Sequence, residues 1–252
     1  IRPKRLLVPS GKHPFPTLSS MNAVEITEAW IKEVQRHGQR ERAAPMEAYM
    51  RHQFPFVGLP KAARQEHQSV LWDKLKGVAL NSSVEVQALV DLLCNQNARE
   101  FQYTAMELAW KTRKQWPEDW PTHVYRRIQT KSWWDTVDWW APKGLGIYLL
   151  DRGGGNCPAF EGILEHLHSH NNLWMKRSAL ILQLHWKDQT RFDWLRTLCL
   201  DHRQTKEFFL AKAMGWALRQ YARTNTLAVQ EFVELHPELP NLTRREALKH
   251  LG

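Results

Sequence analysis

Residues 134–138 read Trp134-Asp135-Thr136-Val137-Asp138, and three further segments begin on an aromatic residue within a similar helical pattern. The four aromatic residues are Phe101, Trp134, Trp174 and Phe209, with spacings of 33, 40 and 35 residues. A period of this size is typical of stacked two-helix repeats, in which each unit buries its apolar face against its neighbours. The sequence therefore predicts an all-α fold, a HEAT-like helical repeat solenoid.

The flanking sequence supports the all-α prediction. Ile26, Trp30 and Val34 form an i, i+4, i+8 apolar stripe that ends at Gly38, and no stretch shows sustained strand alternation. Near the C-terminus, Thr243 and Glu246 have the Thr-x-x-Glu spacing of a helix capping box.

Residues 1–20 differ from the rest of the chain. They contain four prolines and four basic residues, no acidic residue and no helical periodicity, so we expect a Pro-rich basic extension outside the fold. Met21 is a candidate biological start. Residues 21–252 are predicted to form a single repeat domain.

Composition narrows the classes of function. No apolar run is long enough to span a membrane, and Cys94, Cys157 and Cys199 form neither a disulfide framework nor a CxxC metal pattern, which favours a cytoplasmic protein. The formal net charge of +9 suits a nucleic-acid partner. Thirteen tryptophans supply flat rings that can pack in a core or bind bases, sugars and cations.

One group of residues across the repeats could carry chemistry. Trp134 and Asp138 are four apart and share a helix face, and the equivalent face of the next repeat offers Arg177. The following repeat offers Lys212, Trp216, Arg219 and Arg223. Cations attract phosphates, indole faces attract an alkylated base or a developing sugar cation, and the carboxylate can stabilise that cation and deprotonate water. The pattern predicts a concave basic groove that binds DNA.

Each residue also has a structural interpretation. Helically spaced tryptophans are usually core, and this is what we expect of Trp110, Trp133, Trp139, Trp140 and Trp186. Taken singly, Asp138 would be a capping or salt-bridged residue, and Lys212, Arg219 and Arg223 a solvated stripe. Only their conjunction across repeats favours a site.

The chain resembles the AlkD-like DNA alkylation repair proteins, which are HEAT-like-repeat DNA glycosylases. The similarity runs in order over about residues 23–251. It is carried by Pro45–Met50, Arg99–Phe101, Thr130–Asp138, Trp174–Ala179, Lys206–Arg219 and Arg244–His250, and the string Ser132–Asp138 is highly specific.

The resemblance implies a monofunctional alkylpurine glycosylase. It would release N3-alkyladenine and N7-alkylguanine from duplex DNA without a deep base-flipping pocket. It also implies that Trp134, Asp138, Arg177 and Trp216 form the active surface and that Tyr49 helps to hold the DNA. We expect Lys131, Lys212, Arg219 and Arg223 to contact DNA as well.

Other partners and cofactors have weaker support. His166, His168 and His170 do not converge on a helix, and Gly153-Gly154-Gly155 lacks the Lys of a phosphate loop, so no metal and no cofactor are predicted. The expected partner is double-stranded DNA with alkylated purines, bound by a monomer with no membrane contact. Two alternatives remain: a non-catalytic binder of DNA structures, and a helical scaffold for a protein partner.

Overall fold

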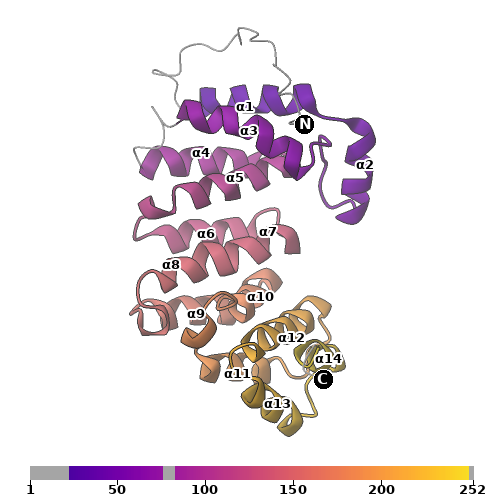
Figure 1. The fold of residues 1–252 in the computed structure, drawn as a ribbon, viewed down its shortest axis with the longest axis vertical. Coiled ribbons are helices and arrows are strands. Elements are labelled where there is room, and N and C mark those ends of the chain that lie inside the picture. The colour runs from indigo at the N-terminus through magenta and orange to yellow at the C-terminus, as the bar shows by residue number, and fades with distance from the viewer. Residues whose placement is uncertain (1–22, 76–82, 250–252) are drawn as a thin grey trace, which may run out of the picture. The chain divides into compact units, whose positions relative to one another are not determined.

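The computed structural model describes residues 23–75 and 83–249, so the Pro-rich extension predicted for residues 1–20 and Met21 lie outside the described residues. Within those two ranges every regular element is a helix and there is no strand (Figure 1). The all-α prediction is confirmed. No helix in the described ranges is both long enough and apolar enough to cross a membrane.

The chain divides into two compact units, residues 1–92 and 93–252. The described part of the first unit contains α1 (Ala23–His37), α2 (Arg40–Tyr49), α3 (Lys61–Leu75) and most of α4 (Ser83–Asn95). Ile26, Trp30 and Val34 of α1 are buried, as their spacing predicts, and α1 packs against α3.

The second unit holds the remaining helices in pairs. They are α5 (Arg99–Lys111), α6 (Trp120–Gln129), α7 (Trp134–Trp139), α8 (Ile147–Leu150), α9 (Phe160–Ser169), α10 (Leu173–Ile181), α11 (Phe192–Asp201), α12 (Phe208–Ala222), α13 (Thr226–Leu235) and α14 (Asn241–Ala247). Figure 1 shows the pairs of this unit following one another, and α10 contacts α6, α7, α9, α11 and α12. A side chain on α10 can therefore reach both neighbouring repeats.

The repeat frame predicted from the aromatic residues matches the helices of the second unit. Phe101, Trp134, Trp174 and Phe209 each lie within the first three residues of α5, α7, α10 and α12. The repeated segments thus begin equivalent helices, which is what a two-helix repeat requires.

Asp138 is followed by an unusual helical segment. Trp140–Gly146 form a π-helix, η3, between α7 and α8. The wide turns expose carbonyls that two buried indoles satisfy: Trp120 Nε1 donates to Gly144 O at 2.9 Å, and Trp186 Nε1 donates to Gly146 O at 3.0 Å. Gly146 is required, because a Cβ there would lie 2.2 Å from the carbonyl oxygen of Leu182. The segment fixes the end of the helix that carries Asp138.

The tryptophans predicted to be core divide into two groups. Trp140 and Trp186 are fully buried, as expected. Trp110, Trp133 and Trp139 are only half-buried, so the prediction of a core position holds for them in part.

The capping box predicted at Thr243 and Glu246 is wrong. Both residues lie inside α14 instead of at its start. The Thr243 hydroxyl donates to Ala211 O on α12 at 2.9 Å, and the Glu246 carboxylate pairs with cations of α12. The spacing of a capping box arises here from two side chains that share the face of α14 packed on α12.

Candidate active site

The centre of the candidate site is an ion pair between Asp138 on α7 and Arg177 on α10. Arg177 Nε donates to one carboxylate oxygen at 2.8 Å and Nη2 donates to the other at 2.7 Å. Bidentate pairs of this kind are the strongest and most directional that these residues make. Two residues that the sequence placed on equivalent faces of successive repeats are therefore in direct contact.

The arginine is held from a third helix. Its Nη1 donates to the carbonyl oxygen of Phe209, at the start of α12, at 2.6 Å, and the side chain is only 4% exposed. Arg177 thus joins α7, α10 and α12 at one point. Its position is set by the fold, so it fixes the orientation of the Asp138 carboxylate.

A second Arg–Asp pair lies in the preceding repeat and provides an internal comparison. Arg99 on α5 donates through Nε and Nη2 to Asp135 at 2.9 and 2.6 Å, and Tyr103 Oη donates to Asp135 Oδ2 at 2.7 Å. Arg99 also donates to Thr136 Oγ1 and to Lys131 O. Asp135 therefore has donors from two side chains and is closed off.

The two aspartates differ in what they can still do. The side chain of Asp138 is 17% exposed, against 6% for Asp135. Among the described residues, Arg177 is the only side chain that donates to Asp138. A carboxylate accepts about four hydrogen bonds, so Asp138 keeps acceptor capacity on its open side. Asp135 is thus enclosed by its partners, whereas Asp138 keeps one side accessible.

Burial raises the pKa of Asp138 above its ordinary value, while the hydrogen bonds and the positive charge of Arg177 act in the opposite direction. A carboxylate with a raised pKa is a stronger base toward water than an exposed one. Asp138 is therefore suited to stabilise a cation in its ionised form and to accept a proton from an attacking water.

Aromatic rings surround the starts of the same helices. Trp133, Trp174 and Phe209 form a cluster in which every pair of ring centroids is 4.9 to 5.5 Å apart. Trp134 lies one helical turn before Asp138 and is half-buried, as is Trp216 on α12. Each of these two indoles is thus anchored in the fold and partly accessible at its surface.

The cations predicted to bind DNA have different environments. Lys212 Nζ lies 2.6 Å from Glu246 Oε1, and Arg219 Nη1 pairs with Glu246 Oε2. The alternative interpretation of these cations as a solvated stripe does not hold for Lys212 and Arg219, because α14 packs beside α12 and brings the Glu246 carboxylate to both. Arg223, just beyond the last residue of α12, is exposed.

Lys131 and Tyr49 complete the predicted DNA contacts. The ammonium group of Lys131 donates to Asn95 O at 2.7 Å and also to Gln96 O, so it caps the C-terminus of α4. Burial lowers the pKa of Lys131. Tyr49 ends α2 in the first unit and is 70% exposed. The Lys131 side chain that was predicted to bind DNA therefore also caps α4.

Sequence reasoning missed two residues of this region, Glu246 and Arg99. Glu246 pairs with two predicted DNA-binding cations, and Arg99 holds the helix turn that precedes Asp138. Both contacts join helices that are far apart in the sequence, so no local motif indicated them.

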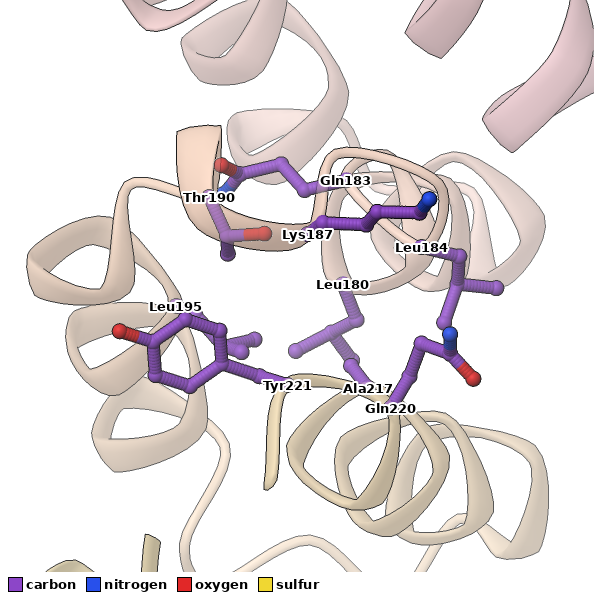
Figure 2. A pocket seen from close by; sticks show the side chains of 9 residues that line it. All are labelled: Leu180, Gln183, Leu184, Lys187, Thr190, Leu195, Ala217, Gln220 and Tyr221. Atoms are coloured by element: carbon purple, nitrogen blue, oxygen red, sulfur yellow. The ribbon is translucent and has the colours of Figure 1, made fainter. Parts of the chain in front are cut away.

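A pocket lies between α10, the start of α11 and α12 (Figure 2), and none of its lining residues belongs to the candidate site. Leu180, Leu195 and Ala217 form its floor, with Lys187 and Tyr221 at its rim. Its empty volume of about 270 Å³ includes space open to solvent, and the part that the centre of a water-sized sphere can reach is only about 10 Å³. That is room for about one water molecule, so the pocket is not a candidate base-binding pocket.

The stacked helix pairs and the open carboxylate define a helical-repeat protein with a candidate active surface on successive repeats. A model of the DNA alkylation repair enzyme family matches residues 30–251, so the chain belongs to that family.

The solved structure of a predicted DNA alkylation repair enzyme from Enterococcus faecalis is similar to this chain, with 32% identity and a TM-score of 0.77. The match covers 85% of this chain and 97% of that one. No curated protein matches the chain significantly.

Proposed function

We propose that the protein is a monofunctional DNA glycosylase that hydrolyses the N-glycosidic bond of cationic alkylpurines in duplex DNA. The substrates would be N3-alkyladenine and N7-alkylguanine. The observation that carries the proposal is the contrast between Asp138 and Asp135: both are held by a buried arginine, but only Asp138 keeps an open side.

The chemistry needs little beyond that carboxylate. Alkylation gives the purine a positive charge, and when the C1′–N bond breaks, the bonding electrons leave with the base and neutralise it. The sugar becomes an oxocarbenium ion, which the ionised Asp138 stabilises electrostatically. Water then adds to C1′ and loses a proton to the carboxylate and on to solvent. The products are a free base, an abasic site and one proton, and no general acid is required.

Arg177 has a positioning role in this scheme. Its side chain is buried and bound to Phe209 O, so it holds the two oxygens of Asp138 in one orientation. A fixed carboxylate does not have to reorganise as charge develops in the transition state, which is the usual source of electrostatic catalysis. The positive charge of Arg177 would repel a cation on the sugar. The scheme therefore requires Asp138 to lie between the guanidinium group and the sugar.

The indoles and the surface cations would bind the DNA. Trp134 and Trp216 can place a ring face against the alkylated base or the sugar, where a cation–π contact contributes about 0.5–2 kcal/mol. Lys212 and Arg219 on α12, and Arg223 just after it, would contact phosphates. Tyr49 and Lys131 would add contacts from other parts of the chain. A surface of this kind does not depend on extruding the base into a deep pocket.

A release assay tests the proposal against its two alternatives. Duplex DNA with a single N7-methylguanine is incubated with the untagged protein, and free base and protein-bound DNA are measured at several salt concentrations. We expect base release above the spontaneous rate, and DNA affinity that falls steeply with salt. Tight binding without release would support the non-catalytic DNA binder, and salt-independent or absent DNA binding would support the protein scaffold.

A further inference from the structure

Two histidines and a glutamate converge in the first unit, on the face where α1 meets α3. His37 Nε2 lies 3.1 Å from Glu33 Oε1, and His67 Nδ1 lies 3.6 Å from the same oxygen. The donor atoms of all three residues are within 4.8 Å of one another. Two residues come from successive turns of α1 and the third from α3, so the cluster is a tertiary one.

These distances are close to those of a metal coordination sphere. Zinc binds imidazole nitrogen and carboxylate oxygen at about 2.0–2.2 Å in tetrahedral geometry, which places ligand atoms about 3.3–3.6 Å apart. The two contacts to Glu33 Oε1 bracket that separation. Small side-chain rotations would admit an ion, and all three side chains are partly exposed and can make them.

The contacts of Glu33 distinguish its two carboxylate oxygens. Arg36 Nη1 contacts the other oxygen of Glu33, Oε2, at 3.4 Å, so Oε1 is the oxygen that faces the histidines. The imidazole rings stack with centroids 3.9 Å apart and planes inclined at 22°. Both imidazoles thus lie beside the same carboxylate oxygen, which places three possible ligand atoms around one point.

We propose that Glu33, His37 and His67 bind a divalent transition-metal ion of the zinc class. Two imidazoles and one carboxylate match the three protein ligands of an open zinc site, with the remaining position taken by water. The ion would fasten α1 to α3. The residues are separate in sequence and in unit from Asp138 and Arg177, so the site is expected to support the stability of the first unit and not the cleavage of the glycosidic bond.

A matched control exists in the second unit. His236 Nδ1 lies 2.9 Å from Glu238 Oε1 in a partly exposed pair. Among the described residues, this pair belongs to no group of three or more possible metal ligands. His236→Gln therefore removes one surface histidine–glutamate contact without removing a three-ligand set. His67→Gln and Glu33→Gln each remove one proposed ligand while keeping a similar shape.

The experiment uses the full, untagged chain stripped of metal with a chelator. Zn²⁺ binding is measured by calorimetry, Co²⁺ binding by visible absorption, and thermal unfolding with and without excess Zn²⁺. We expect one equivalent of Zn²⁺ with micromolar or tighter affinity, a Co²⁺ spectrum without thiolate bands, and a Tm that rises by about 5 °C at about one hundred times Kd.

The variants then decide the assignment. His67→Gln and Glu33→Gln should each weaken Zn²⁺ binding at least tenfold and abolish the rise in Tm, while His236→Gln behaves as wild type. Helical circular dichroism checks that each variant is folded, and if one is not, the other carries the test. Stoichiometric binding that survives both substitutions, thiolate bands in the Co²⁺ spectrum, or no Zn²⁺ binding by the wild type would overturn the proposal.

Discussion

Asp138→Asn should reduce the rate of base release by about 10²–10³-fold. A carboxylate about 4 Å from a full positive charge contributes about 4 kcal/mol at the effective dielectric constant of a protein surface. Arg177, bound to the far side of Asp138, opposes the same charge by about 2 kcal/mol at about 8 Å. Asparagine removes the attraction and leaves the repulsion, so most of the 4 kcal/mol is lost from the transition state.

Asp135→Asn is the matched control, because it removes the same charge from the same kind of ion pair three residues away. Asp135 is bound by Arg99 and Tyr103 and is almost fully buried. Removing one charge of a buried pair costs about 3 kcal/mol of folding free energy. Asp135→Asn should therefore lose at least as much folding free energy as Asp138→Asn. Its rate of base release should fall less than tenfold.

The assay is single-turnover release of N7-methylguanine from a defined duplex. It is run with saturating protein, at a temperature at which circular dichroism shows both variants to be folded. DNA affinity of the two variants is measured under the same conditions and should stay within about threefold of wild type. An equal fall in rate for Asp135→Asn and Asp138→Asn would refute the reasoning, because both effects would then be structural.

Other substitutions and a pH profile test the remaining parts of the site. Arg177→Ala should weaken both base release and DNA binding, because it frees Asp138 and removes the contact to Phe209 O. Release rate and DNA affinity are measured together, and a wild-type value of either would contradict this role. Trp216→Ala should lower release about 2- to 30-fold and Trp216→Phe much less, as a cation–π contact requires. Glu246→Gln should strengthen DNA binding and steepen its salt dependence, because Lys212 and Arg219 lose their carboxylate partner. An unchanged dependence of DNA affinity on salt would place both cations away from the DNA. The rate of base release should rise with pH as Asp138 ionises. Because burial raises the pKa of Asp138, this rise should occur above the ordinary Asp range, and Asp138→Asn should lack it.

The helical repeat and the main ion pair follow from local sequence patterns. Aromatic residues 33 to 40 apart mark the starts of α5, α7, α10 and α12, the equivalent helices of successive repeats. That register places Asp138 and Arg177 on adjacent helices, and the structure joins them directly. A strong periodic pattern therefore carried both the fold and the centre of the candidate site.

The charge balance around the site could not be predicted in the same way. Glu246 follows Lys212 by more than thirty residues, and their contact depends on how α14 packs against α12. The spacing of Thr243 and Glu246 suggested a local cap, but tertiary packing uses both side chains on one face. Likewise, the Lys131 side chain reaches the end of α4 and its backbone has a positive φ of 49°, and no motif indicates either feature.

The π-helix and the histidine cluster show two further limits. No sequence pattern indicated the π-helix after Asp138, which contains Pro142 and whose carbonyls at Gly144 and Gly146 accept hydrogen bonds from the indoles of Trp120 and Trp186. In the first unit, the Glu33 and His37 spacing is visible in the sequence, whereas the approach of His67 requires the packing of α3 on α1.

The central claim is that Asp138 faces positive charge on the sugar. Duplex DNA in which a pyrrolidine replaces the damaged nucleotide presents a ring cation where the oxocarbenium would form, and a tetrahydrofuran presents the same shape without charge. The wild type should bind the cationic duplex at least about tenfold more tightly than the neutral one, and Asp138→Asn should bind the two alike. Equal affinity of the wild type for both duplexes, or a preference that survives Asp138→Asn, would contradict the account.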